Sequence, residues 1–195
     1  MTSSPAGSRG WSPDRPLVRA GVGTALALAA GTRPGLRGAP ARAGARWGAA
    51  AAGAVALGVA AGTLLPAVRR GMAERTSPGA GWAWLAWQIP VGTVWTEEMA
   101  YRGALRTVAQ RAFGRRRGQL VQAAVFGLSH APGARRNGES VLGTVAVTTL
   151  AGWVFGELAD RSGSLLAPML VHLAVNEAGA LATLAVRRRA AAVTG

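Results

Sequence analysis

Residues 47–68 read WGAAAAGAVALGVAAGTLLPAV, a stretch of 22 residues without a charged side chain. An α-helix needs about 20 consecutive apolar residues to cross the hydrocarbon core of a bilayer. In lipid, every backbone N–H and C=O must be satisfied within the protein, so only helices and closed barrels span it. The stretch is far too long for a barrel strand and does not alternate between apolar and polar residues. It therefore predicts a membrane helix.

The composition of the whole chain agrees with a membrane protein. Of its 195 residues, 50% are hydrophobic and only 15% are charged, whereas a soluble domain carries about 25% charged residues. The charged residues are concentrated between apolar runs, as in the connectors of membrane proteins.

Further apolar runs occupy residues 81–96, 120–131, 140–158 and 165–186. Residues 17–30 are also apolar but short for a span, and the sequence does not decide whether they cross the membrane. We therefore predict an all-α fold, a polytopic transmembrane helix bundle with about five or six membrane helices.

Three regions follow from this pattern. Residues 1–46 are expected to form a disordered or weakly apolar N-terminal region, residues 47–189 the transmembrane helical bundle, and residues 190–195 a C-terminal tail. Residues 101–117 carry six arginines among apolar residues at helical spacing. This favours an amphipathic helix at the membrane interface.

The net charge of +14 raises the question of a nucleic-acid partner. All 22 basic residues are arginines, and they cluster at the ends of apolar runs, as in 69–70, 115–117 and 187–189. Arginines in these places are typical of a membrane surface, and no basic and aromatic stripe suited to strand binding is found. We therefore expect the lipid bilayer as a partner, no nucleic acid, and an integral protein of the plasma (cytoplasmic) membrane. The clusters lie at both ends of most spans and so give no orientation.

The absence of two residue types excludes several mechanisms. Without cysteine there are no disulfides, thiolate metal sites or cysteine nucleophiles. Without lysine there are no Ser–Lys dyads and no Schiff bases.

Ionisable residues within apolar segments are costly and therefore informative. The chain has eight acidic residues and two histidines. Glu97 and Glu98 end one apolar run, while His130 and His172 lie inside two others, and Asn176 follows His172 by four positions.

Residues four apart lie on one face of a helix. This spacing predicts that Glu98 pairs with Arg102, that His172 and Asn176 share a face, and that Phe126 packs beside His130. Adjacent residues point about 100 degrees apart, so one glutamate can face the bundle interior while the other meets Arg102.

Such a set suits hydrolysis if the segments converge. A carboxylate in a low-dielectric pocket is a competent general base toward water. A histidine can share the proton or bind a metal, and an imidazole with a carboxamide can stabilise an oxyanion. Taken singly, each feature also fits a solvated interface or a polar contact between helices. We expect Glu157 and Glu177 to have such structural roles.

The three features are Glu97-Glu98-Met99-Ala100-Tyr101-Arg102, Phe126-Gly127-Leu128-Ser129-His130 and His172-Leu173-Ala174-Val175-Asn176. Their order resembles the motifs EExxxR, FxxxH and HxxxN of the CAAX-protease and bacteriocin-processing (CPBP, or Abi) family. That family includes the Ras-converting CAAX endopeptidases. The resemblance covers roughly residues 81–186.

The resemblance implies an intramembrane endopeptidase that hydrolyses a peptide bond in a membrane-associated peptide or protein, prenylated in some relatives. It implies that Glu97 activates the water with help from His130, and that His172 and Asn176 stabilise the oxyanion. Glu98 and Arg102 would orient the first motif, with Phe126 in support. Family members are described both as metalloproteases, here with zinc on Glu97, His130 and His172, and as metal-free glutamate proteases; both fit these residues.

Other readings remain open. A non-catalytic immunity or scaffolding protein of the same family would keep the motifs for structural reasons. A haem protein with His130 and His172 as axial ligands leaves both glutamates and Asn176 unexplained. A transporter with Glu97 as a proton relay is a further alternative.

Overall fold

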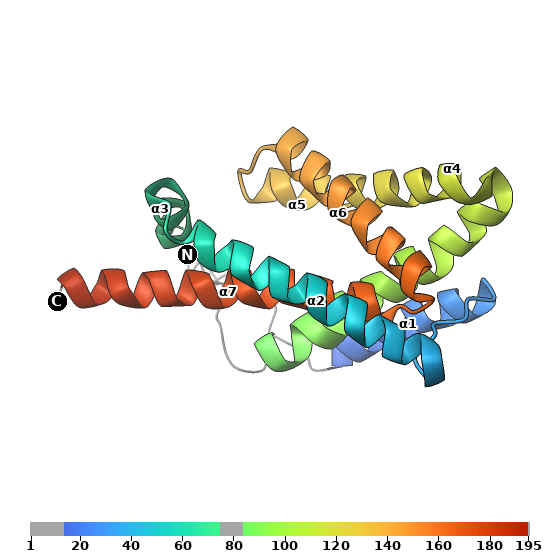
Figure 1. The fold of residues 1–195 in the computed structure, drawn as a ribbon. Coiled ribbons are helices and arrows are strands. Elements are labelled where there is room, and N and C mark those ends of the chain that lie inside the picture. The colour runs from blue at the N-terminus through green and yellow to red at the C-terminus, as the bar shows by residue number, and fades with distance from the viewer. Residues whose placement is uncertain (1–13, 75–83, 195) are drawn as a thin grey trace.

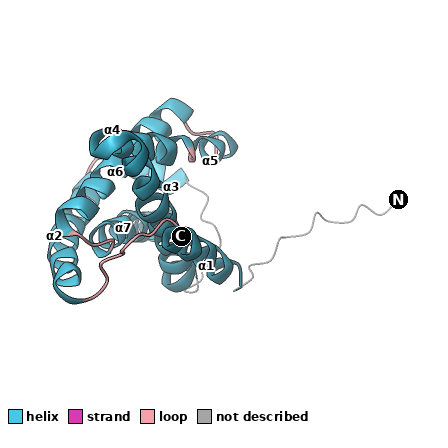
Figure 2. Cartoon of the chain, turned by 90° about the vertical axis from the view of Figure 1, so that its right-hand side faces the viewer, coloured by secondary structure: helices cyan, strands magenta, loops and turns pink. Residues whose placement is uncertain are grey.

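The computed structural model describes residues 14–74 and 84–194, and this part of the chain is helical and contains no strand. The all-α prediction is therefore confirmed. Figure 1 shows the order of the elements, and Figure 2 shows the helices from the side. The elements are α1 (Asp14–Ala29), α2 (Gly38–Gly62), α3 (Pro66–Glu74), η1 (Trp84–Trp95), η2 (Glu98–Leu105), α4 (Arg106–Leu128), α5 (Ala131–Arg136), α6 (Val141–Ser162) and α7 (Leu166–Thr194).

Two helices are long and apolar enough to cross a membrane, α6 as a whole and α7 over Leu166–Arg189. A third span results if α2 and α3 are counted together, although they meet at an angle of 93°. Among the described residues, the expected number of five or six membrane helices is thus not confirmed. Large apolar side chains cover the outside of α6, such as Leu142 and Val147, and these suit contact with lipid.

The first expected span, residues 47–68, is shifted in the structure. The helix begins earlier, at Gly38, and ends at Gly62. Pro66 then begins α3 in a new direction. Proline has no N–H to donate and its ring collides with the preceding turn, so it is favoured at the start of a helix and not within one.

The first motif lies in a run of π-helix. The helices η1 and η2 flank Thr96 and Glu97, which alone have α-helical hydrogen bonding in this run. The hydroxyl of Thr96 donates to the carbonyl of Val91, five residues earlier, at 3.1 Å. π-Helical turns occur often at functional sites.

Helix α4 consists of two arms that meet at Gly114, whose φ of 77° lies in the left-handed region that favours glycine. A Cβ atom at Gly118 would lie 2.5 Å from the backbone nitrogen of Gln110, so the arms touch directly after the reversal. The expected amphipathic helix over 101–117 is therefore divided among η2, the first arm and the start of the second arm, at residues 115–117. The second arm packs along α6. Phe126 lies in its last turn, shortly before His130.

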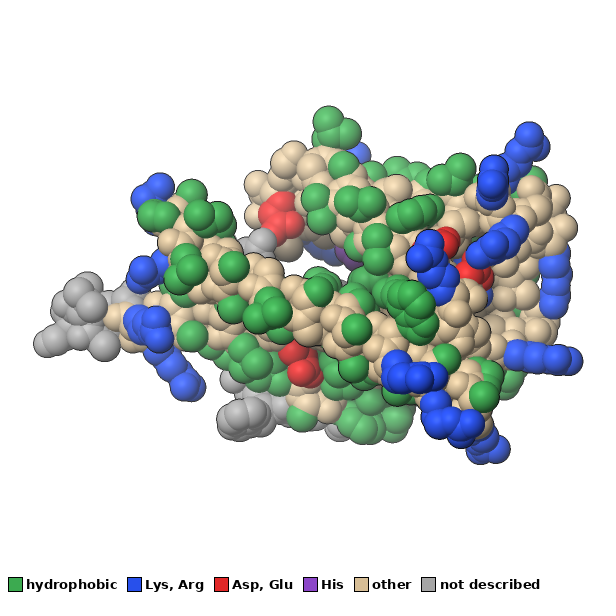
Figure 3. All heavy atoms as spheres, in the orientation of Figure 1, with side chains coloured by type: hydrophobic (Ala, Val, Ile, Leu, Met, Phe, Trp, Pro, Cys, Tyr) green, Lys and Arg blue, Asp and Glu red, His purple; other side chains and the backbone are tan. Residues whose placement is uncertain are grey.

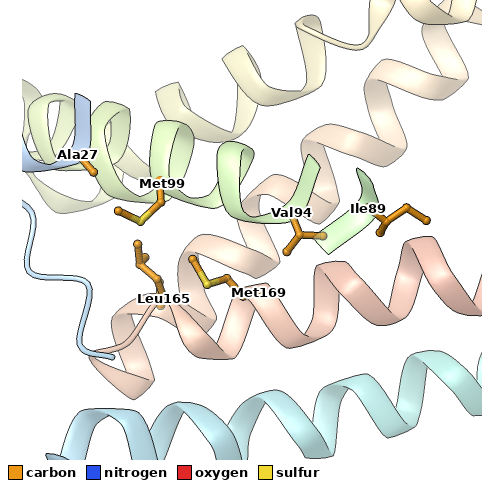
Figure 4. Close-up of a cluster of buried hydrophobic side chains, with 7 residues drawn as sticks. Ala27, Ile89, Val94, Met99, Leu165 and Met169 are labelled. Carbon is orange, nitrogen blue, oxygen red and sulfur yellow. The ribbon is translucent and has the colours of Figure 1, made fainter. Parts of the chain in front are cut away.

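A buried apolar cluster fixes the first motif against α7 (Figure 4). Its side chains come from α1, η1, η2, α6 and the start of α7: Ala27, Ile89, Val94, Met99, Ala159, Leu165 and Met169. Helix α1 is also held by a hydrogen bond from Trp95 Nε1 to Thr24 Oγ1, of 2.9 Å. The part of the N-terminal region that the structure describes, α1, thus supports the helix that carries the first motif; residues 1–13 lie outside the described part.

Candidate active site

The first motif contains an ion pair at the centre of the protein. Oε1 of Glu98 lies 3.0 Å from Nη1 of Arg102, and neither side chain has any exposed surface. The pairing within one motif is the one that the spacing of four residues predicts. Because a buried charge is costly without a partner, each residue depends on the other.

His172 of α7 joins this motif through both of its ring nitrogens. Its Nδ1 lies 2.7 Å from Glu98 Oε1, and its Nε2 lies 3.9 Å from Glu97 Oε2. The side chain of Glu97 is 20% exposed, whereas that of Glu98 has no exposure. Glu98 is therefore the glutamate enclosed by the ion pair, and Glu97 is the one that remains open on one side.

Two aromatic rings enclose the guanidinium of Arg102. Its Cζ atom lies 3.9 Å from the centre of the Phe126 ring and 4.9 Å from that of Phe155. Nε and Nη2 of Arg102 have no hydrogen-bond acceptor among the described residues. Cation–π attraction, which is stronger in a desolvated site, offsets this loss.

The same two rings contact the histidines. Phe126 stands edge-on to His130, with 4.8 Å between ring centres, and edge-on to His172 at 6.2 Å. Phe155 lies 5.2 Å from His172. We did not identify Phe155 from the sequence; the signal was its place between Gly152 and Gly156, a spacing of small residues that is typical of close helix packing.

Close approach of α4 and α6 creates this arrangement. A Cβ atom at Gly152 would lie 3.0 Å from the Phe126 ring, and one at Gly127 would lie 2.8 Å from the carbonyl oxygen of Val145 and closer still to the hydroxyl of Thr149. Glycine at these positions brings the two backbones together, so Phe126 and Phe155 reach Arg102 from neighbouring helices.

His130 is half-buried and lies in the turn between α4 and α5. Its Nδ1 donates to the carbonyl of Phe126 at 2.8 Å, which leaves Nε2 as the nitrogen that can accept a proton. In the described part of the chain, no hydrogen bond or ion pair joins His130 to Glu97 or Glu98. Phe126 therefore contacts both histidines, but His130 stands apart from the carboxylates.

Asn176 lies one turn after His172 on α7. Its amide nitrogen donates to the carbonyl of His172 at 3.1 Å. This bond holds the carboxamide on the face of α7 that carries the imidazole, as the spacing predicts.

The side chains provide part of a zinc site. Glu97 Oε2 has no hydrogen-bond partner among the described residues. The pairing of His172 Nδ1 with a carboxylate is typical of metal-binding histidines. A catalytic zinc needs three protein ligands, however, and no group of three acidic or histidine side chains within the described ranges lies close enough to hold a metal. The expected set of Glu97, His130 and His172 does not fit zinc in this arrangement.

A buried glutamine on α4, Gln122, is a second residue that the sequence did not single out. Gln122 is fully buried, and both polar atoms of its amide lack a partner among the residues described. It precedes Phe126 by one turn. Its neighbour Gln119 donates to the carbonyl of Trp153 at 2.7 Å and so links α4 to α6. The available signal was a pair of amides, one just before and one within the apolar segment 120–131.

A comparison with protein families decides the assignment. The family model for Rce1-like type II CAAX prenyl endopeptidases matches residues 78–178, just over half of the chain, and includes all three motifs. The chain belongs to this Rce1-like family. No curated protein and no solved structure matches the chain.

Membership in the Rce1-like family confirms the resemblance based on the three motifs. The family points to a CAAX-type protease that acts in a membrane on a peptide or protein substrate. Together with the apolar helices α6 and α7, it supports an integral membrane protein. For this Rce1-like chain, the residues of the three motifs are the candidate catalytic group.

Proposed function

We propose that the chain is an intramembrane endopeptidase that hydrolyses a peptide bond with Glu97 as the general base. The observation that supports this most strongly is the unequal environment of the two glutamates. Glu98 is enclosed, and its Oε1 is bound to both Arg102 and His172. The side chain of Glu97 is 20% exposed, whereas that of Glu98 has no exposed surface. A general base must reach water, and of the two glutamates Glu97 is the one with exposed surface.

The charges around Glu97 support this division of roles. Two carboxylates face one guanidinium, so the group is neutral when His172 carries a second ring proton. His172 then donates from Nδ1 to Glu98 and has an N–H at Nε2 on the side of Glu97. In our proposal, Glu98 and Arg102 position His172, and Glu97 acts as the general base.

The reaction proceeds in two steps. Glu97 takes a proton from water while the water oxygen attacks the carbonyl carbon of the substrate peptide. The carbonyl oxygen becomes an oxyanion, which accepts hydrogen bonds from His172 Nε2 and from the amide of Asn176. Glu97 then gives its proton to the amide nitrogen, and the C–N bond breaks to release a carboxylic acid and an amine. One proton passes from the acid to the amine, so the products leave as a carboxylate and an ammonium ion. His130, through its free Nε2, assists proton transfer at the water.

Three finer points are part of the proposal. The substrate is a membrane-associated peptide or protein, prenylated or not. The membrane is the plasma (cytoplasmic) membrane. None of the steps above passes through zinc, because the described side chains do not form a site with three ligands.

The test compares Glu97→Gln with the wild-type protein in liposomes. The probes are two quenched-fluorescent peptides of one sequence that ends in a CAAX motif, one prenylated and one not. We expect Glu97→Gln to lower the rate by at least about a hundredfold, because it removes the general base, without lowering the unfolding temperature. The matched control is Glu157→Gln, which alters a partly exposed pair with Arg161 on α6. If Glu97→Gln cleaved the peptides at the wild-type rate, the proposal would be contradicted.

A further inference from the structure

A groove lies between α2, α3 and α7, and none of the candidate catalytic residues lines it. Its volume is about 420 Å³. The walls are largely apolar and are built from small side chains, Ala56 and Ala60 on α2 and Ala182 and Ala185 on α7. Two arginines, Arg69 of α3 and Arg189 of α7, complete the lining.

The groove arises because α2 and α7 diverge. Near their N-terminal ends they touch: a Cβ atom at Gly44 would lie 2.7 Å from Ser164 Oγ, and one at Gly48 would lie 2.9 Å from the Leu170 side chain. Farther along, side chains of both helices line the groove instead, from Ala56 on α2 and from Ala178 on α7. In Figure 1 α2 crosses α7, and α3 follows the end of α2; Arg69 of α3 lines the groove there.

The two arginines lie where the apolar spans end. Arg189 is the last residue of the apolar segment of α7, and Arg69 follows the sharp bend after α2. In the part of the chain that the structure describes, neither forms an ion pair with a carboxylate. Figure 3 shows basic side chains gathered at this end of the molecule, beside apolar surface.

An apolar groove with two guanidinium groups at its end is complementary to an amphiphile with a negatively charged head. Arginines bind phosphate oxygens strongly through paired N–H donors, and basic residues at the ends of spans attract anionic lipids. Small side chains on both walls leave room for a hydrocarbon chain.

We propose that this groove binds one anionic phospholipid of the surrounding membrane. Its phosphate lies between Arg69 and Arg189, and one acyl chain lies along the alanine walls. The bound lipid fills the groove between α2 and α7 and thereby stabilises α7, the helix that carries His172 and Asn176. This site is separate from the catalytic group, so its test requires no cleavage activity.

The experiment uses the full chain in detergent, to which phosphatidylglycerol or phosphatidylcholine of identical acyl chains is added. Native mass spectrometry counts the lipids retained, and thermal unfolding measures the stabilisation. We expect one phosphatidylglycerol to be retained by the wild-type protein. In Arg69→Gln/Arg189→Gln its binding weakens about thirtyfold, from the contribution of two basic residues near a charged lipid.

The matched control is Arg42→Gln/Arg46→Gln, which removes the same charge from exposed positions at the opposite end of α2. It should bind the lipid as the wild-type protein does. A second variant, Ala182→Leu, narrows the groove without changing the charge and should also weaken binding. Equal retention of the two lipids, equal loss in the control, or displacement of the lipid by a prenylated peptide would overturn the proposal.

Discussion

Nδ1 of His172 lies 2.7 Å from Oε1 of Glu98, although 74 positions separate the two residues in the chain. The same oxygen lies 3.0 Å from Nη1 of Arg102. One carboxylate oxygen thus joins the first motif to the third and also balances a buried guanidinium. The predictions below follow from this contact and from the packing that maintains it.

Glu98→Gln should destabilise the protein strongly. It leaves Arg102 buried without a counter-charge, a change that costs about 3–5 kcal/mol. Unfolding in detergent measures the loss. The double variant Glu98→Gln/Arg102→Met should recover much of it, because no isolated charge remains. Glu157→Gln, which alters the partly exposed pair with Arg161, should cost no more than about 0.5 kcal/mol. Equal effects of Glu98→Gln and Glu157→Gln would contradict the buried pair.

Phe155→Leu should lower both stability and activity. It keeps an apolar side chain but removes one of the two rings that enclose Arg102 and the ring beside His172. We expect a loss of about 1–3 kcal/mol from cation–π and aromatic contacts. Cleavage should fall about tenfold or more because His172 is less well positioned. Trp153→Leu, at an exposed position of the same helix, should change neither; if it matches Phe155→Leu, a general effect on α6 explains the loss.

Gly127→Ala should disturb the contact between α4 and α6. The added methyl group meets the hydroxyl of Thr149 and lies 2.8 Å from the carbonyl of Val145. Such overpacking costs about 1–3 kcal/mol, as thermal unfolding should show. Gly21→Ala on α1, where a Cβ atom meets nothing within 4 Å, should be neutral or stabilising by up to about 1 kcal/mol. Unchanged stability of Gly127→Ala would show that the helices do not approach so closely.

Metal content separates the two mechanisms that the family resemblance leaves open. With no group of three ligands among the described side chains, we expect purified protein to contain far less than one zinc per chain and its cleavage to resist chelators. Elemental analysis of the wild-type protein beside His130→Ala and His172→Ala provides the measurement. One zinc per chain that both variants lose would contradict this expectation and show that the histidines close around a metal.

The sequence by itself determined the helical class, the apolar character of α6 and α7 and the three motifs. It also gave the pairs within each motif, Glu98 with Arg102 and Phe126 beside His130. These are predictable because positions four apart in one helix are neighbours whatever surrounds the helix. Helix ends were less predictable: Pro66 breaks the first span where hydropathy alone continues it.

Only the tertiary structure decided which glutamate His172 binds and that Phe155 covers Arg102. It also decided that His130 has no contact with the carboxylates and that a groove lies between α2 and α7. Each of these depends on how two helices cross and how closely their backbones approach. Crossing and approach are set by the packing of side chains from distant parts of the sequence, such as Gly127 of α4 against Thr149 of α6, and the period of a single helix carries no information about them.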